Sequence, residues 1–214
     1  MSDVKLIAVT KSSGDMNAEE IISYVARVSN PTNQSNFETA PKLLAYLIKH
    51  SHWSPFEHAH MTVEITTSRG IAAQILRHRS FVFQEFSQRY AQSTDYISYP
   101  ARRQDLKNRQ NSVDDMSHDD QVWFSNVQAD VWEMSKRLYD EALKRGVAKE
   151  QARFLLPLNT KTVMYMTGNV RSWIHYIDLR TANGTQQEHA DIASQVKRIF
   201  SEQFPNVSKA LNWT

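Results

Sequence analysis

The stretch RHRSFVFQEFSQRY, residues 77–90, combines three arginines, a histidine and a glutamate with four aromatic rings. Charged residues interleaved with phenylalanine typically line a cavity or an interface, where an arginine can bind phosphate through two hydrogen bonds. The alternative is a solvated helix end, in which Glu85 and Arg89 would form an exposed i,i+4 ion pair. The spacing after Arg79 favours a strand that carries Glu85, Ser87 and Arg89 on one face and leaves the other face for packing.

The sequence around this stretch predicts an α+β fold. Alternating or β-branched residues predict strands at 4–9, 61–66 and 161–166. Apolar residues at helical spacing predict helices at 18–29, 39–50, 68–78, 121–146, 148–155, 169–179 and 186–204. Because strands and helices do not alternate regularly, we expect an antiparallel or mixed sheet flanked by helices. We expect one domain over residues 1–214, with a surface loop at about 101–120.

The long helix predicted at 121–146 is amphipathic, and Gly146 suits its C-terminal end. We expect its apolar residues to face inward; they are Val122, Trp123, Val127, Val131, Met134, Leu138 and Leu143.

The composition excludes several kinds of chemistry. The chain has no cysteine, which rules out disulfides, thiolate–metal sites and thiolate nucleophiles. Its five glycines form neither GxGxxG nor a phosphate-binding loop. The net charge of +2 is too small to indicate nucleic acid as a partner, and no apolar run approaches the ~18 residues of a membrane span. With no signal-peptide pattern either, we expect a cytoplasmic protein that does not bind membranes.

Four of the eight histidines lie in HSHWSPFEHAH, residues 50–60. His58 and His60 would share a strand face, which raises a metal-dependent hydrolase as an alternative function. The nearby carboxylates are limited to Glu57 and Glu64, and the segment has no HExxH pair. We therefore expect no metal, and we expect these histidines to pack beside neighbouring aromatic rings or to line a site for a heterocycle.

Two further segments carry basic residues. Arg171 and His175 are one helical turn apart, and Arg180 falls near the end of the same helix. The alternative is structural, with Arg171 paired to Asp178 and Arg180 as a favourable C-terminal cation. The loop at 101–120 raises the alternative of a nucleic-acid-binding protein, because it contains four basic residues: Arg102, Arg103, Lys107 and Arg109. The negative charges in the acidic half of the loop nearly cancel these positive charges.

The spacing of RHR, seven residues and then Ser87, continued by Arg89 and Tyr90, resembles the signature of the flavin-dependent thymidylate synthases (ThyX). The segments ARVS, HWSPFEH, ARFLLP and GNVRSW followed by LR extend the resemblance over nearly the whole chain. It implies methylation of dUMP to dTMP, with FAD as hydride carrier, NADPH as reductant and 5,10-methylenetetrahydrofolate as carbon donor. It also implies a homotetramer with active sites at subunit interfaces. The lack of cysteine agrees, because the other class of thymidylate synthase uses a cysteine thiolate.

The resemblance implies a role for individual side chains. Arg180 is expected to stabilise charge on the uracil, and Ser87 to position the substrate without acting as a nucleophile. The expected dUMP contacts are Gln74, Arg77, Glu85, Phe86, Ser87, Gln88, Arg89, Arg153 and Arg180. The expected FAD contacts are Ser29, Ser54, Glu57, His78, Arg79, Asn169, Arg171, His175 and Gln186. His52 is expected where folate or nicotinamide reaches the flavin. After Arg180 the chain departs from the family pattern, with Gly184 in place of a histidine and Gln187 in place of a tryptophan.

Overall fold

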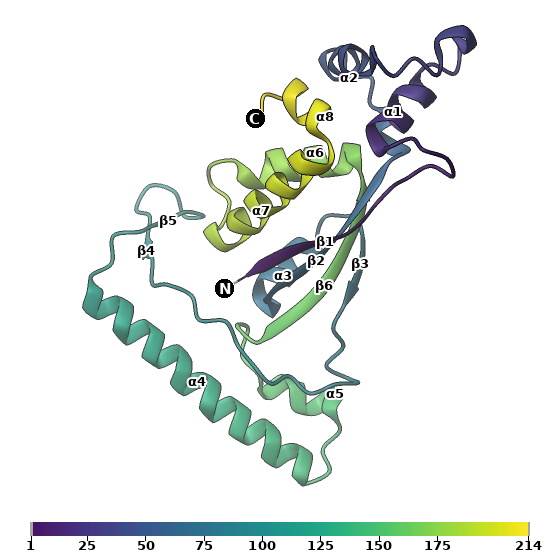
Figure 1. The fold of residues 1–214 in the computed structure, drawn as a ribbon. Helices are drawn as coiled ribbons and strands as arrows, with labels where there is room; N and C mark the ends of the chain where they lie inside the picture. The colour runs from purple at the N-terminus through teal and green to yellow at the C-terminus, as the bar shows by residue number, and fades with distance from the viewer. Residues whose placement is uncertain (1, 214) are drawn as a thin grey trace.

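The computed structural model describes residues 2–213 and is built on a four-stranded antiparallel sheet (Figure 1). The strand order is β1-β2-β6-β3, with β1 at Asp3–Val9, β2 at His60–Ser68, β3 at Val82–Glu85 and β6 at Lys161–Asn169. The two central strands pair over their full length, from His60 opposite Asn169 to Ser68 opposite Lys161. This pairing brings the histidine-rich segment, residues 50–60, next to the start of the helix that carries Arg171 and Arg180, about 110 residues later in the chain.

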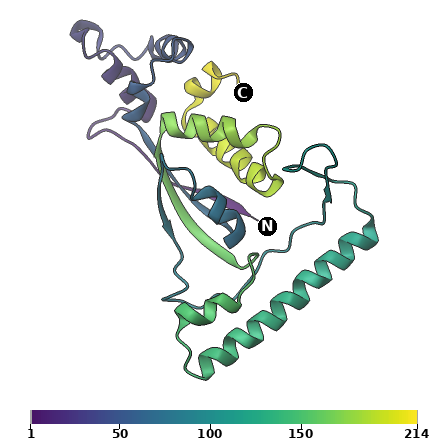
Figure 2. The ribbon, with the colours of Figure 1, turned by 180° about the vertical axis from the view of Figure 1, so that it is seen from behind.

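The helices confirm the expected α+β class, and Figure 2 shows the same arrangement from behind. They are α1 Ala18–Ala26, α2 Ala40–Lys49, α3 Arg69–Ile75, α4 His118–Lys144, α5 Lys149–Ala152, α6 Val170–Thr181, α7 Gln187–Gln203 and α8 Pro205–Ala210. Short 3-10 turns are η1 Pro31–Asn33, η2 Ser54–Glu57 and η3 Arg153–Leu155. A small hairpin, β4 Arg103–Gln104 and β5 Ser112–Val113, lies inside the predicted surface loop. No helix within residues 2–213 is both long enough and apolar enough to cross a bilayer.

One face of the sheet holds the core. Met61, Val63 and Ile65 alternate along β2 and are completely buried, beside Met164 and Met166 of β6. Helices α3, α6 and α7 pack on this face (Figure 1). Burying each such side chain stabilises the fold by about 1.5–3 kcal/mol, and this fixes the helices that carry the arginines against the sheet.

Both central strands continue into a helix without a connecting loop. Ser68 ends β2 and caps α3, since its Oγ accepts a hydrogen bond from the Ile71 backbone N–H at 3.4 Å. Asn169 ends β6 and caps α6, since its Oδ1 accepts from the Ser172 N–H at 2.8 Å. The first turn of each helix is therefore held in a fixed orientation relative to the sheet.

The strand predicted to run through residue 90 is shorter than expected. β3 ends at Glu85, Phe86 makes one further ladder hydrogen bond to Val163, and a turn follows in which the Tyr90 N–H bonds to the Ser87 carbonyl. The prediction that Glu85, Ser87 and Arg89 share one strand face is therefore wrong. Glu85 instead shares a face with Phe83, because residues two apart in a strand point the same way.

Most of the residues predicted to face inward on α4 are exposed. Trp123 is 62% and Met134 53% exposed, and three other apolar side chains are similar: Val122, Val131 and Leu138. Val127 and Leu143 are half-buried, and the α4 rings that are buried are Trp132 and Tyr139. The helix extends away from the sheet and contacts α5 and η3 at one end (Figures 1 and 2). Periodicity shows that a helix has an apolar face, but it does not show what covers that face.

Candidate active site

Four of the residues expected to hold FAD line one cavity of about 870 Å³; they are Glu57, Asn169, Arg171 and His175. Trp53 and Ile174 supply apolar walls to the same cavity. Its volume lies within the ~300–1,000 Å³ typical of small-molecule sites. The cavity therefore has the size and the mixed lining that a nucleotide cofactor needs.

Helix α6 places its polar side chains in this cavity by helical spacing. Arg171, His175 and Asp178 lie on the side of α6 that lines the cavity, and Trp173 and Tyr176 are buried in the core. The Nη1 group of Arg171 donates to Glu57 Oε1 at 2.5 Å, which links α6 to η2. Arg171 thus pairs with Glu57 and not with Asp178, the partner considered from the sequence.

Arg180 is held by His78 at the end of α6. Arg180 Nε donates to His78 Nε2 at 2.8 Å, and because an arginine is always a donor, this nitrogen of His78 must carry a lone pair. Burial lowers the pKa of His78 to about 4, and the nearby charges of Arg180, His175 and Arg77 act in the same direction. His78 is therefore a neutral acceptor at ordinary pH, with Arg180 fixed through one nitrogen.

Sequence reasoning missed two buried residues behind this pair. His189 Nε2 lies 3.1 Å from the Tyr176 hydroxyl, and both side chains are completely buried. Burial, then Arg180 and His78, lower the pKa of His189 to about 3, and burial raises the pKa of Tyr176. Both rings are thus uncharged. In the sequence, the signal for His189 is a histidine at a core position on the apolar face of a predicted helix. Without a structure, this pattern indicates that the ring simply packs in the core.

One residue expected to contact dUMP is hydrogen-bonded to one expected to contact FAD. The Nε2 group of Gln74, a predicted dUMP contact, donates to Oε1 of Gln186, a predicted FAD contact, at 2.6 Å. Gln186 also lines a cavity of about 380 Å³ with Arg102 and Arg109 of the hairpin segment. The loop at 182–187, which departs from the family pattern, thus faces the hairpin in the 101–120 loop.

Three other residues expected to bind dUMP, Glu85, Arg89 and Arg153, have hydrogen-bond partners within the chain. Glu85 Oε1 accepts from Arg69 Nη1 at 2.7 Å and from Thr162 Oγ1 at 2.9 Å. Arg89 Nε donates to Glu150 Oε2 at 3.1 Å, and Arg153 Nε donates to the Glu150 carbonyl at 3.2 Å. The Glu85–Arg89 pair of the solvated-helix alternative is therefore not formed.

The remaining expected dUMP contacts differ in exposure. Arg77 is exposed and Phe86 is 36% exposed. The Gln88 side chain is buried and donates to Ser93 Oγ at 2.9 Å. Ser87 Oγ accepts from the Arg89 backbone N–H at 3.3 Å, and no histidine or carboxylate within residues 2–213 is hydrogen-bonded to it. Within the described residues, Ser87 therefore has no hydrogen-bonded group that could act as its base.

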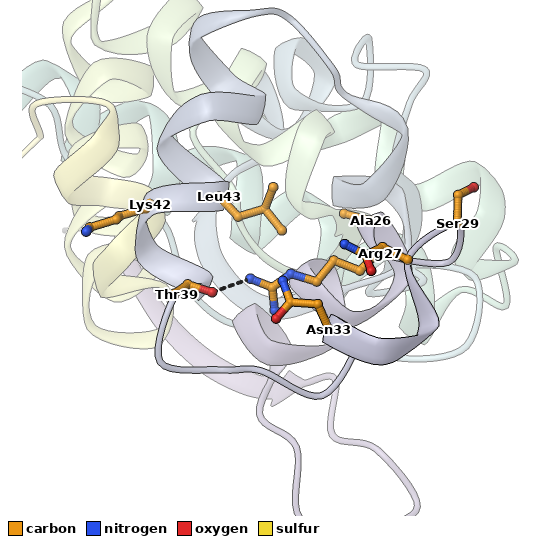
Figure 3. Close-up of a pocket in the computed structure, with 8 residues that line it drawn as sticks. Ala26, Arg27, Ser29, Asn33, Thr39, Lys42 and Leu43 are labelled. Atoms are coloured by element: carbon orange, nitrogen blue, oxygen red, sulfur yellow. Dashed lines mark hydrogen bonds between the residues drawn. The ribbon is translucent and has the colours of Figure 1, made fainter.

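Ser29 lies in a different cavity from the main FAD candidates. That cavity, of about 470 Å³, lies between the end of α1 and the start of α2, and Lys42 also lines it (Figure 3). Arg27 crosses it, bonded to the Asn36 carbonyl and, at 2.8 Å, to Thr39 Oγ1. The residues that the sequence assigns to one cofactor therefore line separate hollows of a single chain.

The histidine-rich segment makes aromatic contacts. His50 stacks on Tyr46 at 4.0 Å between ring centroids, and the exposed His52 ring lies edge-on to Tyr46 at 6.0 Å. Ser54 and Arg79 are exposed. Across residues 2–213, no three histidine, aspartate or glutamate side chains gather as a metal site requires.

The chain matches known proteins over nearly its whole length. The family described as "Thymidylate synthase complementing protein" matches residues 6–206. A probable flavin-dependent thymidylate synthase of Paramecium bursaria Chlorella virus 1 is 58% identical over 212 residues, which is 98% of each chain. The flavin-dependent thymidylate synthase of Synechocystis sp. is 53% identical over 99% of this chain and 100% of its own. A UMP/dUMP methylase, PolB from Streptomyces cacaoi, superposes with a TM-score of 0.85 at 24% identity, covering 100% of this chain and 95% of that one.

Proposed function

This chain belongs to the thymidylate synthase complementing protein family, and we propose that it is a flavin-dependent thymidylate synthase that methylates dUMP to dTMP. The structural observation that carries the proposal is the single cavity that gathers Glu57, Asn169, Arg171 and His175. The metal-dependent hydrolase is not supported, since the relatives have a different activity and no metal-binding cluster lies within the described part of the chain.

The residues of the large cavity fit FAD. Arg171 supplies a fixed cation for a pyrophosphate, and Trp53 and Ile174 supply apolar surface for a ring. When bound, the flavin supplies the hydride chemistry, with NADPH as reductant and 5,10-methylenetetrahydrofolate as carbon donor. We assign Ser29, Ser54, His78, Arg79 and Gln186 to the same cofactor, and His52 to the region where folate or nicotinamide enters.

The chain's own part in the reaction is positioning and electrostatics. Arg77, Arg89 and Arg153 neutralise the phosphate of dUMP. Arg180 uses its Nε on His78, which leaves its two terminal nitrogens to face the uracil and stabilise the negative charge that develops on the ring. Gln74, Glu85, Phe86, Ser87 and Gln88 complete the nucleotide pocket in this assignment, with Ser87 as a hydrogen-bonding partner.

We propose a homotetramer with active sites at subunit interfaces. Two observations support it: the FAD candidates are divided among separate hollows of one chain, and α4 exposes a stripe of Trp123, Val131, Met134 and Leu138. An exposed apolar patch of this kind typically marks a protein interface. We also propose a cytoplasmic location, because the substrates are charged metabolites that do not cross membranes unaided.

Absorbance and product analysis test this function. The purified protein should be yellow, with absorbance near ~450 nm from bound flavin, and should convert dUMP to dTMP when NADPH and methylenetetrahydrofolate are present. Arg171→Leu should lose flavin absorbance, whereas Arg145→Ala, which removes an exposed arginine that directly follows α4, should retain it. A protein that binds no flavin and forms no dTMP would overturn the proposal.

A further inference from the structure

His189 occupies a core position that packing alone does not explain. The other buried residues of α7 are apolar, and they are Ile192, Ala193, Val196, Ile199 and Phe200. His189 is completely buried, yet its Nδ1 has no hydrogen-bond partner within residues 2–213. A buried polar atom without a partner lowers stability, and a leucine of similar volume would fill the same space without that cost. His189 therefore lowers the stability of the core, which indicates that it serves a purpose other than packing.

A continuous chain of contacts leads from His189 to Arg180. His189 Nε2 is within hydrogen-bond distance of the Tyr176 hydroxyl, at 3.1 Å. The Tyr176 ring meets the His78 ring edge-on, with centroids 4.9 Å apart at 80°. His78 then accepts the hydrogen bond from Arg180 Nε. The His189 ring also lies perpendicular to His78, at 6.0 Å.

The chain of contacts joins three separate parts of the fold. His189 is on α7, Tyr176 and Arg180 are on α6, and His78 follows α3. Without the hydrogen bond at its hydroxyl, the Tyr176 ring would be held by apolar contacts alone, which leave small rotations and shifts open. A shift of the Tyr176 ring would move the ring that packs edge-on against His78, and His78 would move with it. Because His78 accepts the hydrogen bond from Arg180 Nε, the plane of the Arg180 guanidinium would then change as well.

We propose that His189 and Tyr176 are positioning residues, which fix His78 and through it aim the terminal nitrogens of Arg180 at the uracil. This inference rests on the proposed function and extends it to residues that touch neither ligand. Positioning errors well below 1 Å reduce catalysis by preorganised groups, so the loss of either partner should reduce turnover without abolishing the fold.

The proposal predicts opposite effects on stability and on turnover. His189→Leu removes the unpartnered nitrogen, so the melting temperature should stay the same or rise, while kcat for dTMP formation falls about tenfold. The KM for dUMP should change less than about twofold, because the phosphate is held by other arginines. Tyr176→Phe should lower kcat by a similar factor, and the double variant should lose no more than either single one.

Two further variants make the test specific. His189→Gln places an amide where the imidazole Nε2 lies, so it should restore most of the lost kcat. Val196→Ala opens a cavity on the same buried face of α7 and should lower the melting temperature without changing kcat at 25 °C. Wild-type kcat in His189→Leu, or a His189→Gln variant as slow as His189→Leu, would overturn the inference. A wild-type protein that forms no dTMP would instead overturn the proposed function.

Discussion

Arg89 and Glu150 form an exposed ion pair, and in the proposed assignment the phosphate of dUMP competes with Glu150 for Arg89. Their side chains are 64% and 47% exposed, and such pairs stabilise a fold by only ~0–1 kcal/mol. Arg89→Ala should therefore leave the melting temperature nearly unchanged. It should remove one or more charge-assisted hydrogen bonds to the phosphate, each of about 1.5–3 kcal/mol, and weaken dUMP binding by roughly 10- to 150-fold.

Glu150→Gln should have the opposite effect on binding. At the observed 3.1 Å, the Coulomb attraction between the two side chains is about 1.3 kcal/mol in a water-like medium. Removing the negative charge frees Arg89, so dUMP should bind up to about tenfold more tightly. The backbone carbonyl of Glu150, which accepts from Arg153, remains in place.

Isothermal titration calorimetry of dUMP into the flavin-loaded protein measures both changes. Arg145→Ala is the matched control, because Arg145 forms a similarly exposed pair with Glu141 at 2.8 Å. An Arg89→Ala variant that binds dUMP as tightly as the wild type does would refute the role of Arg89 in binding the phosphate. Weaker binding by Glu150→Gln would also refute the competition, because Glu150 would then assist the substrate.

Three further outcomes are expected. Gly168→Ala would place a Cβ 2.4 Å from Phe81 Cδ1 and should destabilise the fold by about 1–3 kcal/mol in urea unfolding; an unchanged midpoint would contradict this close contact. The folded-state pKa of His189 lies near 3, below the ~6.5 of an unfolded histidine. The stability that the neutral His189 ring gives the fold is therefore fully present above pH ~6.5 and is lost as the pH falls toward 3. Between pH 7 and pH 5 the wild type should therefore lose about 2 kcal/mol more stability than His189→Leu does, and equal losses at matched protein concentration would argue against a neutral buried ring. Trp123→Ser with Leu138→Ser should lower the oligomeric state in analytical ultracentrifugation together with flavin retention, and a monomer that keeps its flavin and full activity would disprove the shared site.

Local patterns in the sequence predicted the elements of the fold but not all of their surroundings. The helices around Leu44 and Val196 follow from apolar spacing, and the α+β class follows from their order. The strand predicted from Phe81 is too long, because the chain leaves the sheet at the turn from Ser87 to Tyr90 while the partner strand β6 still extends back to Lys161. The short final helix α8 was missed, since its six residues carry too little periodicity.

The residues of the candidate site could be predicted from the sequence, but their partners in the fold could not. The fixed spacing of RHR and Ser87 resembles a family signature, and this resemblance implies contacts to the nucleotide and the flavin; the motif could be read because it is local in the chain. The partners of those residues are distant in sequence: Glu57 reaches Arg171 across 114 positions, and Gln74 reaches Gln186 across 112. Such contacts are set by the pairing of β2 with β6 and by the packing of α7, neither of which leaves a pattern in a single sequence.

The direct passage from strand to helix at Ser68 and at Asn169 limits where the chain can change in length. A single residue inserted at either junction would turn the following helix by about 100° relative to the sheet. After Asn169 that rotation would swing Arg171 and His175 out of their cavity and carry Arg180 away from His78 in one step. Insertions and deletions should therefore be rejected at the ends of β2 and β6, where a strand passes directly into the helix that it positions.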